Sequence, residues 1–406
     1  MKNIAILVIV IFLFPVSLWA ADFGLILDQS AGAGGAVSGD PAADYEASLI
    51  PRFSFLLGDP SNQSFGELII TAGITAGYEN EFYCIPDLLR TELSWRFGRV
   101  QITAGRMEYT APFAYAAEGL FDGFQFAYNG PAGIFSVGTW YTGLLNKKKA
   151  NIIMTEEETS SYYTAVDYDN FSGTYFASKR MITALGWEHP ALAKLLRTQL
   201  AVIAQTDLNG GEDHLHSQYV TAKIGIPVNR FFFELSGAVE LEEIDNDFNI
   251  GLAGELGAFW DLPAAFSSRL SFTGYYSSGK TASGSLAAFT PVTAKFYGNI
   301  LGAKPSGISV FSLDYTARLY KTFSIDLTSS YFIRNDLGTY AGYPADRENN
   351  DGYFLGNEFF AQLTWSPFSD LQIIPGGGIF LPSMGNAAPG RKPQWRIELA
   401  AVLSLY

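Results

Sequence analysis

Apolar and polar residues alternate along most of this chain, and the alternation is clearest between Phe231 and Leu262. From Phe231 to Glu242, the odd positions are apolar apart from one glycine, while four of the six even positions are polar or charged. A period of two places successive side chains on opposite faces of a β-strand. After a short acidic break the pattern resumes, with Ile250, Leu256 and Trp260 on one face. Each run is about a dozen residues, enough for a tilted strand to cross a bilayer, although the apolar face would equally suit a soluble core.

The same period predicts about eighteen strands, with sixteen as the alternative count. They span residues 22–30, 46–57, 65–78, 88–97, 100–109, 123–129, 134–143, 175–188, 195–207, 215–227, 231–242, 249–262, 268–278, 307–320, 323–334, 353–366, 371–381 and 394–406.

The connections between these strands distinguish a membrane barrel from a soluble one, because short and long connections alternate. The short ones, rich in the Gly, Pro, Asn and Asp of tight turns, lie at 58–64, 97–99, 129–133, 189–194, 227–230, 261–267, 321–322 and 366–370. The intervening ones lie at 31–45, 79–87, 110–122, 144–174, 208–214, 243–248, 279–306, 335–352 and 382–393, and most are longer. This layout predicts an all-β fold, a transmembrane antiparallel up-and-down β-barrel with short periplasmic turns and long extracellular loops.

Four tryptophans support a membrane setting, because each lies near a predicted short turn and on the apolar face of its strand. They are Trp95, Trp187, Trp260 and Trp365. Tryptophans at one height and facing outward form the aromatic girdle of a membrane–water interface. The alternative is four unrelated core residues.

Composition fits an exported membrane barrel. The chain has 406 residues, a net charge of −14 and one cysteine, so no internal disulfide forms. Residues 1–20 have the positive start, apolar centre and small-residue exit of a signal peptide. Residues 21–406 are then expected to form a single barrel domain in the bacterial outer membrane. No later stretch is apolar enough for a spanning helix, and the acidic balance argues against nucleic acid as a partner.

If the apolar faces contact lipid, the polar faces line a lumen, and barrels of this size hold a water-filled channel unless a loop plugs them. The expected basic pore-lining residues are Arg52, Arg90, Arg96, Arg106, Arg180, Arg197 and Lys223. The expected acidic ones are Glu234, Glu240, Glu255, Asp314, Asp326 and Glu358. Basic residues fall in the earlier half of the chain and acidic ones in the later half, so a closed barrel would set them on opposed walls and create a transverse field.

The connection Thr110–Asp122 is unusually apolar for an exposed loop, which predicts that it folds into the pore. Arg106 breaks the local alternation, and a bulge at Gly105 would turn it inward. Gly105–Arg106 and Phe121–Asp122–Gly123 resemble the Gly-Arg and Phe-Asp-Gly pairing of alginate-export-like and related substrate-specific porins. That resemblance implies an eighteen-strand channel, monomeric or trimeric, for anionic or small polar solutes.

The last twelve residues, 395–406, resemble the terminal strand that the barrel-assembly machinery recognises in bacterial outer-membrane proteins. They depart from that pattern in register, because Tyr406 shares a face with Arg396 and Glu398 rather than with the apolar residues. Either a bulge shifts the register or the final residue lies beyond the membrane.

The remaining motifs do not point to catalysis. The longest connection, 144–173, holds three lysines at 147–149 and three glutamates at 156–158, and we expect it to be a mobile outer loop rather than a self-paired hairpin or a partner-binding surface. His214 and His216 share a strand face, and 346–351 is rich in oxygen ligands, but neither spacing predicts a metal site. The chain contains no nucleophile elbow and no phosphate-binding loop.

The sequence therefore predicts a porin for passive diffusion of small polar or charged solutes, with no cofactor, no metal and no enzymatic activity. Its expected partners are outer-membrane lipid, small solutes and the assembly machinery, and the oligomeric state is left open. Two alternatives remain. One is a plugged-lumen transporter for hydrophobic compounds that opens through the barrel wall, which Phe232, Phe332 and Phe360 on the lumen face would suit. The other is a surface adhesin or structural barrel.

Overall fold

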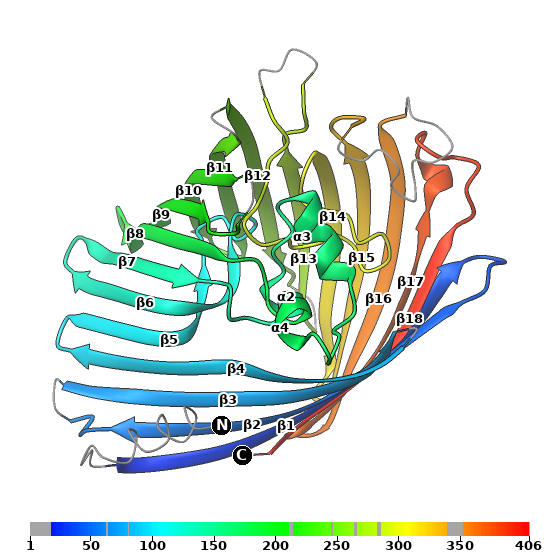
Figure 1. The fold of residues 1–406 in the computed structure, drawn as a ribbon. Helices are drawn as coiled ribbons and strands as arrows, with labels where there is room; N and C mark the ends of the chain where they lie inside the picture. The colour runs from blue at the N-terminus through cyan, green and yellow to red at the C-terminus, as the bar shows by residue number, and fades with distance from the viewer. Residues whose placement is uncertain are drawn as a thin grey trace.

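In the computed structural model, the chain forms one antiparallel sheet of 18 strands that closes on itself (Figure 1). Each strand pairs with the next along the sequence, and the first strand pairs with the last from Leu25 opposite Leu405 to Ala36 opposite Gln394. Closure leaves the sheet without a terminal edge strand, which is the condition for a sheet to exist in lipid. The predicted eighteen-strand up-and-down barrel is confirmed.

The structure describes residues 18–61, 64–79, 81–210, 214–244, 247–263, 266–281, 286–338 and 352–405. The strands are β1 (Leu18–Ala36), β2 (Ala42–Leu57), β3 (Ser64–Glu79), β4 (Glu81–Phe97), β5 (Val100–Thr110), β6 (Glu118–Gly130), β7 (Gly133–Tyr141), β8 (Arg180–Leu192), β9 (Leu196–Asp207), β10 (Leu215–Val228), β11 (Phe231–Ile244), β12 (Asp247–Asp261), β13 (Ser267–Ser277), β14 (Ile308–Tyr320), β15 (Phe323–Arg334), β16 (Phe354–Phe368), β17 (Leu371–Leu381) and β18 (Gln394–Leu405). The helices are α2 (Lys147–Ala150), α3 (Glu156–Tyr163), α4 (Phe171–Thr174) and the short η1 (Pro382–Met384).

The alternation in sequence becomes the two faces of the barrel wall. Along β11, Leu235 and Val239 face outward and are 58% and 50% exposed. Glu240, the next residue after Val239, lies on the opposite face and is fully buried. The large exposed side chains on the strands are mostly Phe, Tyr, Leu, Ile and Val, so the outer wall is apolar. Such a wall is stable against hydrocarbon rather than water. Among the described residues, no helix is both long and apolar enough to cross a membrane.

Several predicted boundaries differ from the structure. β4 begins at Glu81, opposite Glu79 of β3, so residues 81–87 of the predicted connection at 79–87 belong to a strand. The sequence did not indicate this extension of β4, because it contains Pro86 and its apolar and polar residues alternate only weakly. β8 begins at Arg180 rather than at residue 175, because 171–174 form α4. Residues 1–17 of the predicted signal peptide, the acidic segment 346–351 and Tyr406 lie outside the described residues, and residues 18–20 begin β1.

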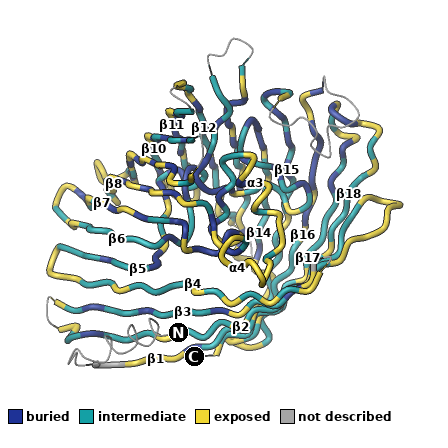
Figure 2. The backbone as a smooth tube through the Cα atoms, viewed as in Figure 1, coloured by how far each residue is buried: buried dark blue, intermediate teal, exposed yellow. Residues whose placement is uncertain are grey.

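Three long connections fold into the barrel rather than away from it. They are the β5–β6 loop (residues 111–117), the β7–β8 loop (142–179) and the described parts of the β13–β14 loop (278–281 and 286–307). The most buried parts of the chain lie in these loops and in the wall of β7–β15 around them, while β1–β4 are mainly half-buried or exposed (Figure 2). The hydrophobic core of the protein therefore fills part of the lumen.

Candidate pore constriction

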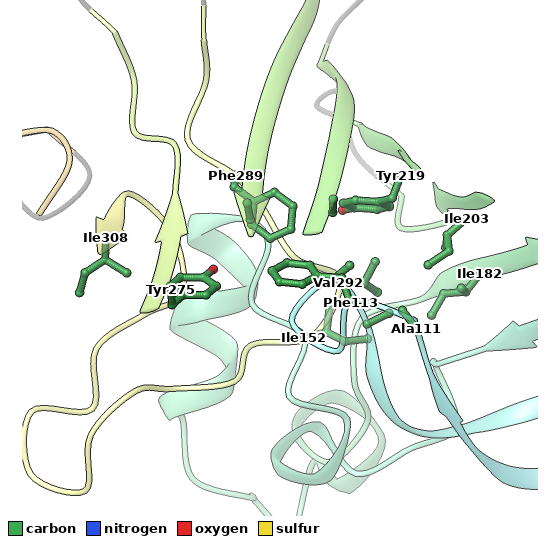
Figure 3. Close-up of a cluster of buried hydrophobic side chains, with 14 of the residues drawn as sticks. Ala111, Phe113, Ile152, Ile182, Ile203, Tyr219, Tyr275, Phe289, Val292 and Ile308 are labelled. Carbon is green, nitrogen blue, oxygen red and sulfur yellow. The ribbon is translucent and has the colours of Figure 1, made fainter. Parts of the chain in front are cut away.

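The centre of the constriction is an aromatic cluster shared by the β5–β6 loop, the β13–β14 loop and the wall. Phe113 and Phe289 are fully buried, and their ring centroids are 6.1 Å apart (Figure 3). Phe113 also lies parallel to Tyr275 of β13, at 6.3 Å. Burial of such rings drives the loops onto the wall through the hydrophobic effect. The prediction that Thr110–Asp122 folds inward agrees with the burial of Phe113, Ala116 and Ala117.

Hydrogen bonds join the three loops into one unit. The Val292 N–H donates to the Ala116 carbonyl at 2.8 Å, and the Glu118 N–H donates to Thr293 Oγ1 at 2.8 Å. The Ala294 N–H donates to the Asn151 carbonyl at 2.9 Å, which brings in the β7–β8 loop. Bonds between all three loops fix their relative positions more tightly than contact with the wall alone.

Two predicted pore residues on the acidic wall hold the β13–β14 loop instead of facing open solution. Glu358 of β16 is 2% exposed and accepts the backbone N–H groups of Asn299, Ile300 and Leu301 at 2.7, 3.1 and 2.9 Å. Glu240 of β11 is fully buried and accepts the Thr290 N–H at 2.7 Å. Both side chains point to the inside of the barrel, as expected. They are not exposed to a pore, because the loop covers them.

Arg106 occupies the point where β5 leaves β4. Gly105 has a φ of +108°, and a Cβ there would lie 1.8 Å from the Thr91 carbonyl oxygen, so this bend requires glycine. The Arg106 guanidinium donates to both carboxylate oxygens of Asp122, at 2.9 and 2.8 Å, and to the carbonyls of Leu88 and Leu144. The bend at Gly105 turns Arg106 inward, as expected. Because Arg106 is only 5% exposed, its side chain holds neighbouring segments together and does not present its charge to the pore.

Arg180 is also buried. Its guanidinium contacts Glu158 of α3 at 2.5 Å and Asp207 of β9 at 3.2 Å, and its exposed fraction is 0%. Glu158 closes a capping box with Thr155, which starts α3. The β7–β8 loop is thus folded and anchored to the wall, so the expectation of a mobile outer loop is wrong, as is a pore-lining role for Arg180. From the sequence alone, Glu158 would be taken for an exposed surface residue, because its partner Arg180 is distant along the chain.

The other predicted lumen residues differ in the partners that they contact. Lys223 pairs with Glu234 at 2.8 Å, and Arg90 pairs with Glu92 at 2.7 Å. Asp314 accepts from Thr328 at 2.8 Å, Glu255 lies 3.5 Å from the Tyr297 hydroxyl, and Asp326 is half-buried. Within the described part of the chain, Arg52, Arg96 and Arg197 have no carboxylate within ion-pair distance. Arg96 and Arg197 lie over the rings of Phe65 and Phe232.

Sequence reasoning missed the β13–β14 loop, which contributes a tyrosine and a lysine to the constriction. Tyr297 stacks on Tyr115 at 4.8 Å, and Lys295 pairs with Glu118 at 2.9 Å. Burial raises the pKa values of Tyr115 and Tyr297 above the usual range, so both hydroxyls stay neutral. The Phe, Tyr and Val residues at 289–297 were the available signal, since an exposed loop rarely carries so many.

The four tryptophans lie near the short turns, and Trp260 and Trp365 are 37% and 38% exposed. Trp260 stacks on Phe231 at 5.6 Å and Trp365 on Phe323 at 5.8 Å, while Trp95 lies 6.0 Å from Phe97. The Trp187 indole donates to the Ala132 carbonyl at 2.9 Å. Among the residues described, no group of three or more His, Cys, Asp or Glu side chains is arranged to hold a metal.

The closed wall, apolar outside and polar inside, defines a transmembrane β-barrel whose lumen is partly filled by loops. No protein-family model and no curated protein matches this chain, but solved structures match nearly its whole length. OccK2 (OpdF) from Pseudomonas aeruginosa has a TM-score of 0.62 at 12% identity, covering 96% of this chain and 99% of its own. The outer membrane protein OprD from the same organism gives 0.59 at 13%, covering 96% and 95%.

OccAB1 from Acinetobacter baumannii gives a TM-score of 0.59 at 9% identity, covering 97% of this chain and 99% of its own. At such identities the likeness shows a shared fold. The chain thus has the architecture of bacterial outer-membrane barrels such as OprD, as the resemblance to porins implied. The narrower resemblance to alginate-export-like porins stays a prediction.

Proposed function

We propose that this protein is an outer-membrane channel for passive diffusion of small polar or charged solutes. The observation that carries the proposal is a closed barrel whose lumen keeps charged side chains of both signs. Some predicted lumen charges hold loops or bind buried partners, as Glu240, Glu358, Arg106 and Arg180 do. Among the described residues, Arg52, Arg96 and Arg197 have no carboxylate within ion-pair distance, and Glu255, Asp314 and Asp326 have no cation within ion-pair distance.

The remaining lumen suits hydrated solutes. Beneath the β5–β6 loop lies a cavity of about 200 Å³ whose lining includes Glu108, Gln125, Ser136 and Gln199. Carboxylate, amide and hydroxyl groups exchange hydrogen bonds with water and polar solutes at little cost. The local concentration of anions is raised beside Arg52, Arg96 and Arg197, and that of cations beside Glu255, Asp314 and Asp326.

The setting in the membrane follows the same reasoning. Trp95, Trp187, Trp260 and Trp365 would form the girdle at the short-turn interface, and strand β18 would be the segment recognised by the assembly machinery. The fold shared with the outer membrane protein OprD supports this location. No residue of the constriction is assigned a catalytic role.

The test is the reversal potential of single channels in a planar bilayer under a salt gradient. We expect steady conductance in the wild type. Replacement of Arg52, Arg96 and Arg197 by glutamine should shift the preference toward cations, while Arg99→Gln in an exposed turn should leave it unchanged. Arg90→Gln should have a smaller effect, since Glu92 already balances that charge. Absence of conductance from protein shown to be folded by heat-modifiable gel migration would refute the channel.

A further inference from the structure

The barrel wall divides between β4 and β5 in its half nearer the long loops. β4 pairs with β5 only from Thr91 to Phe97, whereas β3 accompanies β4 along its whole length to Glu81. Beyond Arg106, β5 continues with β6 and turns into the lumen, where Met107 is 2% exposed. Among the described strands, β4 residues 81–90 therefore pair on one side alone. An unpaired strand edge in a membrane barrel requires other partners for its backbone.

Side chains supply those partners, and two of them come from the β7–β8 loop. The Tyr168 hydroxyl accepts the Cys84 N–H at 3.1 Å and donates to the Cys84 carbonyl at 2.6 Å. The Tyr175 hydroxyl lies 3.0 Å from both the Pro86 carbonyl and Asp87 Oδ1. Pro86 has no N–H to satisfy, which suits an edge position. Arg106 covers the next carbonyl, that of Leu88, where the two strands part.

This seal differs from a strand ladder in what holds it. Two tyrosine hydroxyls on one loop replace a run of backbone hydrogen bonds, so the wall can open here by moving the loop without unpairing any strands. Aromatic side chains of the same loop pack beside the seal, where Phe171 stacks on Tyr175 at 4.5 Å and Phe176, which is 37% exposed, lies 5.1 Å from Tyr175. On the outer side Phe82 is 74% exposed and Leu88 is 42% exposed.

A buried cation lies directly behind the seal. Lys147 begins α2, its backbone N–H donates to the Tyr175 carbonyl at 3.0 Å, and the residue is 5% exposed. Within the described residues its Nζ has no hydrogen-bond acceptor. Arg106, in contrast, is matched by Asp122 and Asp87. A buried ammonium without an acceptor is unfavourable, and burial lowers the pKa of Lys147 accordingly. An anionic group placed here would supply what Lys147 lacks.

We propose that the division between β4 and β5 is a lateral portal, closed here by Tyr168 and Tyr175, through which amphipathic monoanions pass between the lumen and the outer leaflet. The acidic head of such a molecule would pair with Lys147, and its apolar tail would displace the aromatic seal. The proposal rests on the proposed function in that the lumen behind the portal conducts solutes.

The first experiment measures binding to protein in lipid nanodiscs by calorimetry, with empty nanodiscs subtracted. The probe is octane-1-sulfonate, which stays ionised, and methanesulfonate provides the same head without the tail. We expect octane-1-sulfonate to bind at least about tenfold more tightly than methanesulfonate, and Lys147→Gln to weaken that binding about tenfold. Lys149→Gln is the matched control, because Lys149 lies in the same helix and is exposed. Equal binding by Lys147→Gln and the wild type would overturn the anion site.

The second experiment measures how fast octane-1-sulfonate blocks the current of single channels. The double variant Tyr168→Phe, Tyr175→Phe keeps the rings and removes both hydroxyls, so it should raise the rate of block several-fold. Tyr331→Phe is the control, since its hydroxyl also bonds a loop carbonyl, that of Met384, away from the portal. An unchanged rate in the double variant would overturn the lateral route. Steady conductance that octane-1-sulfonate does not affect would reject the portal but not the channel. Absence of conductance would reject the channel, and the nanodisc titration would then still test the anion site at Lys147.

Discussion

Substitution of Glu358 by glutamine should release the β13–β14 loop without unfolding the barrel. The carboxylate accepts three backbone N–H groups, through Oε1 from Asn299 and through Oε2 from Ile300 and Leu301. Hydrogen bonds to a charged group contribute about 1.5–3 kcal/mol each, against about 0.5–1.5 kcal/mol for neutral ones. Glutamine can keep one acceptor oxygen and must turn an NH₂ group toward the other donors.

The loss of about 1 kcal/mol at each of three bonds gives about 3 kcal/mol for the loop, before non-additivity. A change of that size raises the equilibrium constant for local opening by about two orders of magnitude. The barrel ladder is untouched, because Glu358 uses its side chain and the strand pairs through its backbone.

Two measurements report this opening. Hydrogen exchange at the amides of 299–301 should accelerate by about a hundredfold, and trypsin should cleave faster after Lys295, which is 49% exposed at its side chain. Glu234→Gln is the control, since Glu234 also faces the lumen but bonds Lys223 rather than the loop. If Glu358→Gln exchanges and is cleaved like the wild type, the aromatic cluster alone holds the loop and the anchoring role is wrong.

Two further substitutions test the β7–β8 loop and the junction at Gly105. Arg180→Met leaves Glu158 and Asp207 buried without their cation, so it should destabilise the attachment of α3 by about 3–5 kcal/mol. Protease cleavage within 156–163 should then appear, while gel migration still shows a folded barrel. Resistance to cleavage would contradict the role of Arg180 as an anchor for α3. Gly105→Ala forces a Cβ against the Thr91 carbonyl at a φ of +108°, which should cost about 1–3 kcal/mol and lower the folded fraction after refolding into detergent. Gly119→Ala, whose Cβ would lie at an ordinary contact distance of 3.5 Å from the Phe121 ring, should fold like the wild type.

Most of the barrel could be predicted from the sequence because a strand between lipid and a polar lumen must alternate with period two. Phe231–Glu242 is assigned the correct faces residue by residue on that ground alone. Prediction was weaker where a stretch of the wall does not have lipid on one face and lumen water on the other. Residues 81–87 of β4 border a loop rather than a strand, and residues 175–179 precede β8 behind the seal, so neither stretch alternates clearly.

The constriction could be predicted only in part. Thr110–Asp122 signalled its inward path through its apolar composition, and Gly105–Arg106 signalled a bulge through broken alternation. The partners of Arg180, Glu240 and Glu358 could not be found in this way. Each carries a polar side chain at a lumen position, where exposed and loop-covered residues look alike in sequence.

The sequence by itself determined the class of fold, a count of about eighteen strands and the face of most strand side chains, since these follow from local periodicity and the spacing of turns. The tertiary structure alone decided which lumen charges remain available to a solute. That outcome depends on contacts between residues far apart in the chain, such as Glu358 with Asn299 or Arg180 with Glu158. Pairing distant charges removes them from the pore and leaves others, including Arg52 and Lys147, to give the lumen its chemistry.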